Sequence, residues 1–199
     1  MNHADWGRVP TLAGTHVRLE PLQMAHIDGL RGAIGDGAMC SLGYTLVPDA
    51  KGMTGYVQAA LRAHAEGKAL PFVAFDADGQ VVGTTRYYEL EPEVPRLTIG
   101  YTWYAPWAQR TGVNTEAKLM LLRHAFERLG CISVAFQTST SNHASRAAIA
   151  RLGASQDGVL RNHRRHPDGS PRDTVIFSIL DTEWQGVKRN LQYRLDSHA

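Results

Sequence analysis

The sequence has little cysteine and no strong excess of charge of either sign. Cys40 and Cys131 are its only cysteines, and they stand far apart, without the spacing of a metal or redox site. Two cysteines in a chain this long do not make a disulfide framework, so we expect both to be reduced and structural, and we expect no metal. The formal net charge is only +2, whereas nucleic-acid-binding proteins usually carry a basic excess on one face.

Long apolar runs are also missing. No stretch approaches the roughly 18–20 apolar residues that span a membrane, and the N-terminal stretch MNHADWGRVP has no signal-peptide core. These absences predict a soluble, cytoplasmic protein with neither a membrane nor a nucleic acid as direct partner. With 43% hydrophobic residues in 199, the chain can bury a full core as one domain over 1–199. Residues 1–11 would form an N-terminal extension, and 182–199 a C-terminal helix.

The residue pattern predicts a mixed α/β domain. Alternating or β-branched runs predict strands, and Asp76-Ala77-Asp78-Gly79 predicts a hairpin turn in which Gly79 takes a positive φ. The expected strands are 15–22, 71–75, 80–90, 96–104, 131–139 and a final hairpin over 158–180. Helical spacing predicts helices over 23–37, 56–67, 113–129, 142–152 and 182–195. Helices 113–129 and 142–152 are each flanked by strands, which favours a central sheet with helices on both faces.

One loop and helix start, QRTGVN (109–114), has the setting of an anion site. The first N–H groups of a helix lack internal partners, and a glycine there lets a phosphate approach the backbone. The plain alternative is a capped helix, because Thr111, Asn114 or Thr115 would each serve as N-cap and Glu116 already complements the dipole. The loop has neither the ending of a P-loop nor the glycine spacing of a dinucleotide fingerprint.

A second motif follows in the order strand, Ser141-Asn142-His143-Ala144-Ser145, helix, Leu152-Gly153-Ala154. Together with the QRTGVN loop and the final hairpin, this order resembles the GNAT superfamily of acyl-CoA N-acyltransferases, and more narrowly its RimJ/RimL-like branch. The likeness spans about residues 12–185. It implies a central, mostly antiparallel, splayed sheet of six to seven strands flanked by helices.

The resemblance also implies a co-substrate, acetyl-CoA, and assigns residues to it. Backbone groups near Trp103 and Tyr104 would pair with the pantetheine amides, and Asn142 would hydrogen-bond the pantetheine arm. The backbone N–H groups from Arg110 to Thr115 would hold the pyrophosphate. The implied co-substrate residues are Trp103, Tyr104, Gln109, Arg110, Thr111, Gly112, Val113, Asn114, Thr115, Asn142 and Ser145.

The implied reaction is direct attack of a neutral amine on the thioester of acetyl-CoA. Ser145 would protonate the departing thiolate. A purely structural role, as a hydroxyl in the first turn of a helix, explains this residue equally well. The acceptor would be a protein N-terminal α-amino group or a small-molecule amine. The family likeness also leaves room for a homodimer.

Two positions depart from the family pattern. Ile149 stands where many relatives have a tyrosine acid, and Thr98 stands where relatives in this branch often have a glutamate that could act as base. Glu89, Glu91 and Glu93 precede the same strand and are the nearest candidates in sequence, although a solvated acidic loop is the commoner reading for each. Without an obvious base, an amine of low pKa, such as an α-amino group, is mildly favoured.

The sequence also fits two other functions. A module that binds acyl-CoA without turnover fits the absence of a base and of the tyrosine, and a nucleic-acid binder would rest on the basic segment RNHRRHPDG (161–169). Within that segment, His163 and His166 lack a third ligand for a metal. Arg161, Arg164 and Arg165 fit either an acidic acceptor or an exposed basic hairpin. Arg86, Tyr87 and Tyr88 could line the acceptor side.

Overall fold

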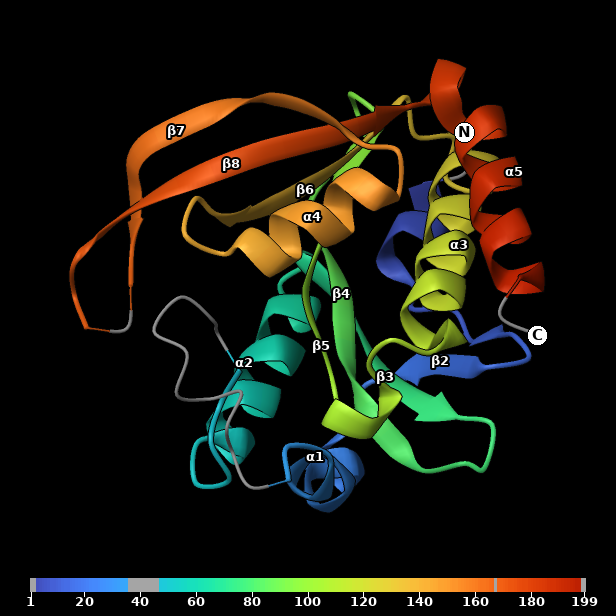
Figure 1. The fold of residues 1–199 in the computed structure, drawn as a ribbon. Helices are drawn as coiled ribbons and strands as arrows, with labels where there is room; N and C mark the ends of the chain where they lie inside the picture. The colour runs from blue at the N-terminus through green and yellow to red at the C-terminus, as the bar shows by residue number, and fades with distance from the viewer. Residues whose placement is uncertain (1–2, 36–46, 167, 198–199) are drawn as a thin grey trace.

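The computed structural model describes residues 3–35, 47–166 and 168–197 and contains five α-helices and eight strands in these ranges (Figure 1). The helices are α1 (Ile27–Ala33), α2 (Met53–Ala65), α3 (Gly112–Glu127), α4 (His143–Arg151) and α5 (Asp181–Asp196). The strands are β1 (Leu12–Ala13), β2 (Val17–Pro21), β3 (Ala69–Asp76), β4 (Val81–Glu91), β5 (Arg96–Tyr104), β6 (Ser133–Ser139), β7 (Ser155–Arg165) and β8 (Pro171–Leu180).

All eight strands belong to one sheet with the order β1-β2-β3-β4-β5-β6-β8-β7. Every neighbouring pair is antiparallel except β5 and β6, which are parallel and joined through α3. The predicted mixed α/β fold with a mostly antiparallel sheet is therefore confirmed. The sheet has one strand more than the upper predicted number, because β1 is only two residues long, too short to show an alternating pattern.

Local signals in the sequence place most elements correctly. The strand predicted over 96–104 is β5, and α3 begins at Gly112, one residue before its predicted start. Gly79 in the β3–β4 turn has φ +81°, and Gly67 after α2 has φ +69°, values that glycine adopts without the steric penalty of a Cβ. The predicted turn residue Pro167 and the other cysteine, Cys40, lie outside the described residues.

The parallel pairing of β5 and β6 ends early. It runs from Arg96 opposite Ser133 to Ile99 opposite Phe136, although both strands continue beyond these residues. Farther along, β5 stays paired with β4 and β6 stays paired with β8. The sheet therefore splits into two halves that diverge between β5 and β6, as the family resemblance implies.

A bulge in β5 coincides with this divergence. Gly100 lies opposite Arg86 and Trp103 opposite Thr84, so one extra residue is inserted into β5. Tyr101, within the insertion, has φ +51°, a region that a bulky residue seldom occupies. Bulges bend a strand and redirect its side chains, and this one lies where β5 leaves β6.

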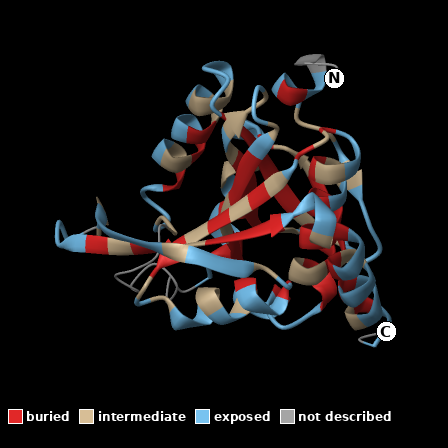
Figure 2. Cartoon of the chain, turned by 90° about the horizontal axis from the view of Figure 1, so that it is seen from above, coloured by how far each residue is buried: buried red, intermediate tan, exposed pale blue. Residues whose placement is uncertain are grey.

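The helices cover both sides of the central strands. In Figure 1, α1 and α2 lie on one side of β4 and β5, and α3 and α5 lie together on the other. Figure 2 shows the buried residues concentrated in the strands and on the inner faces of the helices, whereas the β7–β8 hairpin extends away from them. Trp6 in the expected N-terminal extension is only 5% exposed, so that segment is anchored in the core.

Glu116 ties the start of α3 to the loop before β2. The sequence suggested only that this carboxylate complements the helix dipole. In the structure it is buried and accepts hydrogen bonds from the N–H groups of Thr15, His16 and Val17 at 2.8, 2.6 and 2.9 Å. A Cβ at Gly14 would collide with the same carboxylate. Three bonds to a charged acceptor fix α3 relative to the sheet edge.

The composition predicts that Cys131 is a free thiol and that no segment spans a membrane. Cys131 is a buried free thiol, as expected, and burial raises its pKa to about 12. Across residues 3–35, 47–166 and 168–197, no helix is both long and apolar enough to cross a membrane.

Candidate functional site

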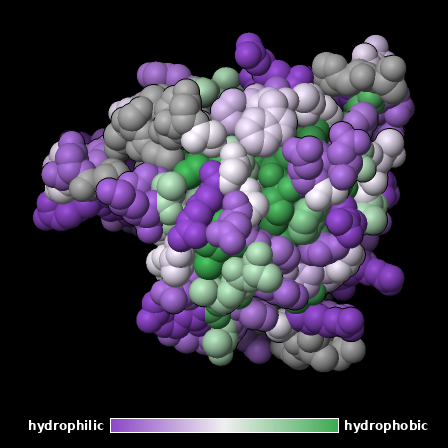
Figure 3. Space-filling view, turned by 90° about the horizontal axis from the view of Figure 1, so that it is seen from below, coloured by the Kyte–Doolittle hydropathy of each residue, from purple (hydrophilic) through white to green (hydrophobic). Residues whose placement is uncertain are grey.

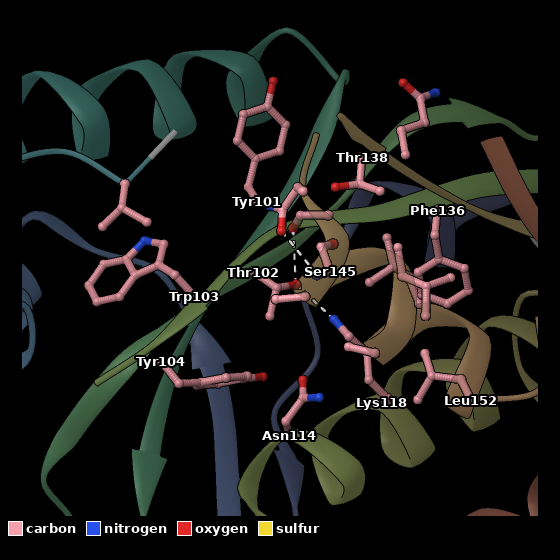
Figure 4. Close-up of a pocket in the computed structure, with 18 of the residues that line it drawn as sticks. Tyr101, Thr102, Trp103, Tyr104, Asn114, Lys118, Phe136, Thr138, Ser145 and Leu152 are labelled. Atoms are coloured by element: carbon pink, nitrogen blue, oxygen red, sulfur yellow. Dashed lines mark hydrogen bonds between the residues drawn. The ribbon is translucent and has the colours of Figure 1, made fainter. Parts of the chain in front are cut away.

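A cleft of about 570 Å³ opens where β5 and β6 diverge. Its walls come from the second half of β5, the end of β6, the first turns of α3, and α4. Figure 4 shows residues of these elements pointing into a common space. Seen from below, the molecule has apolar surface in a hollow bordered by hydrophilic side chains (Figure 3). A cleft with apolar walls and a few polar groups is typical of a small-molecule site.

The β5 wall contains two buried polar atoms without partners. Trp103 and Tyr104 both line the cleft and are 6% and 5% exposed. Trp103 Nε1 and Tyr104 Oη make no hydrogen bond within the described part of the chain. Burial raises the pKa of Tyr104, so its phenol stays protonated. Buried polar atoms are nearly always paired, so these two are exceptions that lie in the wall of the cleft.

The start of α3 is capped by Thr111. Its Oγ1 accepts from the N–H of Val113 at 3.2 Å and donates to the carbonyl oxygen of Ala108 at 2.7 Å. Arg110, just before it, has φ +61°. The N–H groups of Arg110 and Gly112 donate to no other residue that the structure describes. The helix is thus both capped and still able to offer backbone donors.

Gly112 has a packing role that the sequence did not reveal. A Cβ at this position would lie 2.7 Å from two carbon atoms of the His16 ring. We attributed the glycine to the approach of an anion. Contact with the loop before β2 requires a glycine as well, so a bulky substitution here would disturb the fold and would not be a clean test of ligand binding.

The start of α4 is capped by Asn142. Its Oδ1 accepts from the N–H of Ser145 at 3.0 Å, and this bond does not use the side-chain NH₂ group of Asn142. Asn142 and Ser145 both line the cleft. Their arrangement agrees with the motif, and their roles toward a ligand stay predictions.

The structure brings only part of the predicted set to the cleft surface. The members that line it are Trp103, Tyr104, Gln109, Arg110, Asn114, Asn142 and Ser145. The other members are not among the residues that line the cleft: Thr111 is the N-cap of α3, and Gly112, Val113 and Thr115 belong to its first turn. Gln109 also has a local role, since its Nε2 donates to the Tyr104 carbonyl oxygen at 2.9 Å.

Lys118 is a cleft residue that the sequence analysis missed. It is 6% exposed, and its Nζ donates to Thr102 Oγ1 at 2.7 Å; Figure 4 shows it reaching from α3 toward β5. No carboxylate forms an ion pair with it in the described chain. Burial lowers the pKa of Lys118 to about 7. The sequence did contain a signal for its inward position, because Lys118 lies four residues after Asn114, inside an otherwise apolar helix segment.

The carboxylate of Glu89 lies beside the cleft. Glu89 Oε2 accepts from Thr98 Oγ1 at 2.8 Å and from Gln137 Nε2 at 2.7 Å, and Arg164 approaches Glu89 Oε1 at 3.4 Å. Glu89 belongs to β4 and not to the following loop. Glu91, by contrast, forms an exposed ion pair with Arg96. Glu89 thus places a carboxylate directly against Thr98, the position where relatives often carry a glutamate.

We expect Lys118→Met to raise the free energy of unfolding most at low pH. The pKa of this lysine is near its ordinary value of 10.5 in the unfolded chain and about 7 in the folded one. Below pH 7 the folded wild type therefore bears the full cost of a buried charge, on the order of 5 kcal/mol. As pH rises from 7 toward 10.5, the folded state has already lost its proton and this cost disappears. Denaturant unfolding of both proteins at pH 6.5, 8 and 9.5 measures the gap.

The exposed Lys51→Met is the matched control, because the Lys51 side chain is in contact with water in both states. Its stability difference from the wild type should be small and constant over this pH range. A Lys118→Met difference that does not shrink as the pH rises would contradict the assignment of a charged, desolvated lysine.

Comparisons with known proteins agree with this geometry. Residues 17–155 match the Acetyltransferase (GNAT) domain. The Bacillus subtilis protein named "Putative ribosomal N-acetyltransferase YdaF" is 32% identical over 111 residues, 56% of this chain and 60% of that protein, so the match spans less than two thirds of the relative. A T. thermophilus protein described as a putative acetyltransferase is 34% identical with a TM-score of 0.81, over 93% of this chain and 96% of that one.

The fold is also that of Mycobacterium smegmatis RimJ in complex with CoA-disulfide, which is 23% identical with a TM-score of 0.77 over 94% of this chain and 96% of that one. No group of three or more His, Cys, Asp or Glu side chains that could hold a metal occurs among the residues with described positions. The domain match covers well over half of the sequence. The matched residues include the divergent strands β5 and β6 and the capped helices α3 and α4. The chain belongs to the GNAT family of acetyltransferases and resembles its RimJ/RimL-like branch.

Proposed function

We propose that this chain transfers an acetyl group from acetyl-CoA to a primary amine by direct attack within a ternary complex. The observation that carries the proposal is the cleft at the divergence of β5 and β6, which has a strand edge without a strand partner and is lined by residues from the N-terminal turns of α3 and α4. An extended ligand with amide groups and a terminal pyrophosphate suits that combination. Backbone edges pair with the amides, and helix N–H groups receive the phosphates.

The co-substrate would be held by backbone and side-chain groups that line or border the cleft. Backbone donors and acceptors of β5 beyond Ile99 face the side that β6 has left, and they would pair with the pantetheine arm. The N–H groups around Gly112 would receive the pyrophosphate, with Arg110 adding a positive charge. The NH₂ group of Asn142 and the Nζ of Lys118 would donate to carbonyl oxygens of the arm.

Glu89 is our candidate for the general base. The amine nitrogen would attack the thioester carbonyl carbon, the C–S bond would break, and the amine proton would pass to Glu89 directly or through a water. Thr98, Gln137 and Arg164 hold this carboxylate in place. A backbone N–H of β5 would stabilise the oxyanion. Ser145 would pass its proton to the CoA thiolate and regain one from solvent, to which Glu89 releases the amine proton.

Glu89 also bears on the alternative of a module that senses acyl-CoA without turnover. That alternative rested on Thr98 and Ile149, which leave no base or acid at two family positions. A carboxylate that reaches the Thr98 hydroxyl from the next strand supports an enzyme. It also weakens the argument from a missing base that favoured an acceptor of low pKa, so protein N-termini and small-molecule amines both stay candidates. The name of the B. subtilis relative points to a ribosomal protein as one acceptor.

Thermal unfolding with acetyl-CoA, free CoA or ATP tests the co-substrate. A ligand at about 100 times its Kd adds roughly 2.7 kcal/mol to the stability of the folded state, which is a rise of several degrees for a chain of this size. We expect that rise with acetyl-CoA and CoA and not with ATP. If none of the three shifts the midpoint, the cleft does not bind the co-substrate and the proposal fails.

Replacing Glu89 by Gln should lower kcat/KM by about 100-fold or more at neutral pH for an alkyl amine, because the amide cannot take a proton. Acetyl-CoA affinity should not change. The activity of the variant should recover as the pH rises toward the pKa of the amine, which then loses its proton to solvent. Glu91→Gln, on the same strand but in a surface ion pair with Arg96, is the control. Full activity of Glu89→Gln at pH 7 would exclude Glu89 as the base.

Two substitutions at Asn142 separate its cap from its contact with the co-substrate. Asn142→Ser keeps a cap oxygen and loses the NH₂ donor, so stability should stay near that of the wild type while acetyl-CoA binding weakens by about 1–2 kcal/mol. Asn142→Ala should lose both, with about 1 kcal/mol less stability. Calorimetric titration and denaturant unfolding measure the two effects. Equal acetyl-CoA affinity in the wild type and Asn142→Ser would remove Asn142 from the site.

A further inference from the structure

Two arginines near the cleft are buried. Arg86 lies on β4 and Arg172 on β8, on opposite sides of the β5–β6 divergence. They are 7% and 8% exposed. Neither forms an ion pair within residues 3–35, 47–166 and 168–197. The proposed acetyl transfer assigns no role to either residue.

Arg86 is held by aromatic rings. Its guanidinium carbon lies 3.9 Å from the centroid of the Tyr101 ring and 5.1 Å from that of Tyr56. Arg86, Tyr101 and Glu89 line a second cavity of about 390 Å³. Tyr101, the residue at the β5 bulge, also lines the main cleft. Stacking holds the guanidinium by its faces and leaves its N–H donors free for a ligand.

Arg172 lines the main cleft, and its Nε is a buried donor without a hydrogen-bond partner in the described chain. It lies directly across the β7–β8 pair from Arg164, whose charge is already engaged by Glu89 and Gln137. Burial and the nearby Arg164 charge lower the pKa of Arg172, and Tyr88 and Tyr101 lie close enough to oppose that shift. Tyr101 stacks on Arg86 and lines the same cleft as Arg172.

Desolvating a guanidinium without an anion is costly, and one such residue in a fold needs an explanation. Two of them line two cavities that share Tyr101 and adjoin the proposed reaction site, and together they point to a ligand that brings negative charge. A carboxylate suits them, because its two oxygens accept the paired N–H donors of a guanidinium. Glu89, on the same side, is placed for the amine end of such a ligand.

We infer that the acceptor is an amine that also carries a carboxylate, and that Arg172 and Arg86 receive this carboxylate beside Tyr101 while the amine faces Glu89. This inference rests on the acetyl transfer proposed above and narrows its acceptor to one chemical class. The carboxylate has two sources, a free aminocarboxylic acid or the acidic side chain of a peptide N-terminal residue.

Matched acceptor pairs test the inference and separate the two sources. The first pair is L-glutamate and L-glutamine α-amide, and the second is the C-terminally amidated peptides Glu-Ala-Ala and Gln-Ala-Ala. Thiol release from acetyl-CoA gives kcat/KM for each, and calorimetry with CoA-loaded protein gives binding even where turnover is slow. We expect the acidic member of at least one pair to be preferred by about 10- to 100-fold, the range of a charged hydrogen bond.

Arg172→Gln and Arg86→Gln should each remove most of this preference while leaving acetyl-CoA affinity within about twofold of the wild type. Kinetics with the uncharged member of each pair should change little, which a merely structural role would not predict. Arg161→Gln is the matched control, since Arg161 is exposed on the same hairpin as Arg172. Thermal unfolding should show that the variants fold, because a buried charge is removed.

The outcomes are distinct. Preference for the acid in the wild type, lost in both arginine variants and kept in Arg161→Gln, supports the inference. Acetyl-CoA binding with equal binding and use of acid and amide in both pairs overturns it and leaves the acetyl transfer standing. A preference that survives in Arg172→Gln and Arg86→Gln also overturns it. Failure to bind acetyl-CoA at all overturns the proposed function and this inference together.

Discussion

The short parallel contact between β5 and β6 is the constraint on which the site depends. Parallel strands need a crossover, and α3 supplies it, so the start of that helix lies at the end where the strands diverge. Each strand keeps its outer neighbour after Ile99 and Phe136, so the sheet opens without unravelling. The open edge and the position of the helix N-terminus are consequences of one topological arrangement, and the bulge at Tyr101 lies at the same place.

Polar groups without partners collect around this opening. Trp103 Nε1, Tyr104 Oη and Arg172 Nε are buried and unpaired within the described chain, and Lys118 donates to the Thr102 hydroxyl in place of a carboxylate. Glu116, on the far side of α3, shows the opposite case, a buried charge with three hydrogen bonds. The contrast indicates that stability is lost locally at the cleft.

The sequence predicted the parts of the fold that depend on local signals. The signals for the strand Arg96–Tyr104, for the cap at Asn142 and for the three candidate caps of α3, of which Thr111 is the one used, lie in short windows, and the structure has these features. The β1 strand, the packing of Gly112 against His16, and the burial of Lys118 depend on residues distant in the chain. The periodic pattern of residues along a sequence gives no information about contacts between distant segments. A lysine in particular is expected on a helix surface, so its inward position could be found only from the assembled structure.

Glu89, on β4, takes the place of a carboxylate that is missing at position 98 of the neighbouring strand β5. Three steps along β4, from Tyr88 to Glu91, span two steps of β5, from Thr98 to Arg96, and Glu89 within this irregularity has φ +51°. In a regular pairing, side chains alternate between the faces of the sheet. The extra residue breaks that alternation, and the carboxylate of Glu89 meets the Thr98 hydroxyl at 2.8 Å. A single inserted residue in β4 therefore puts an acid where β5 itself has only a threonine, and Glu91, two residues away, pairs with Arg96 at the surface instead.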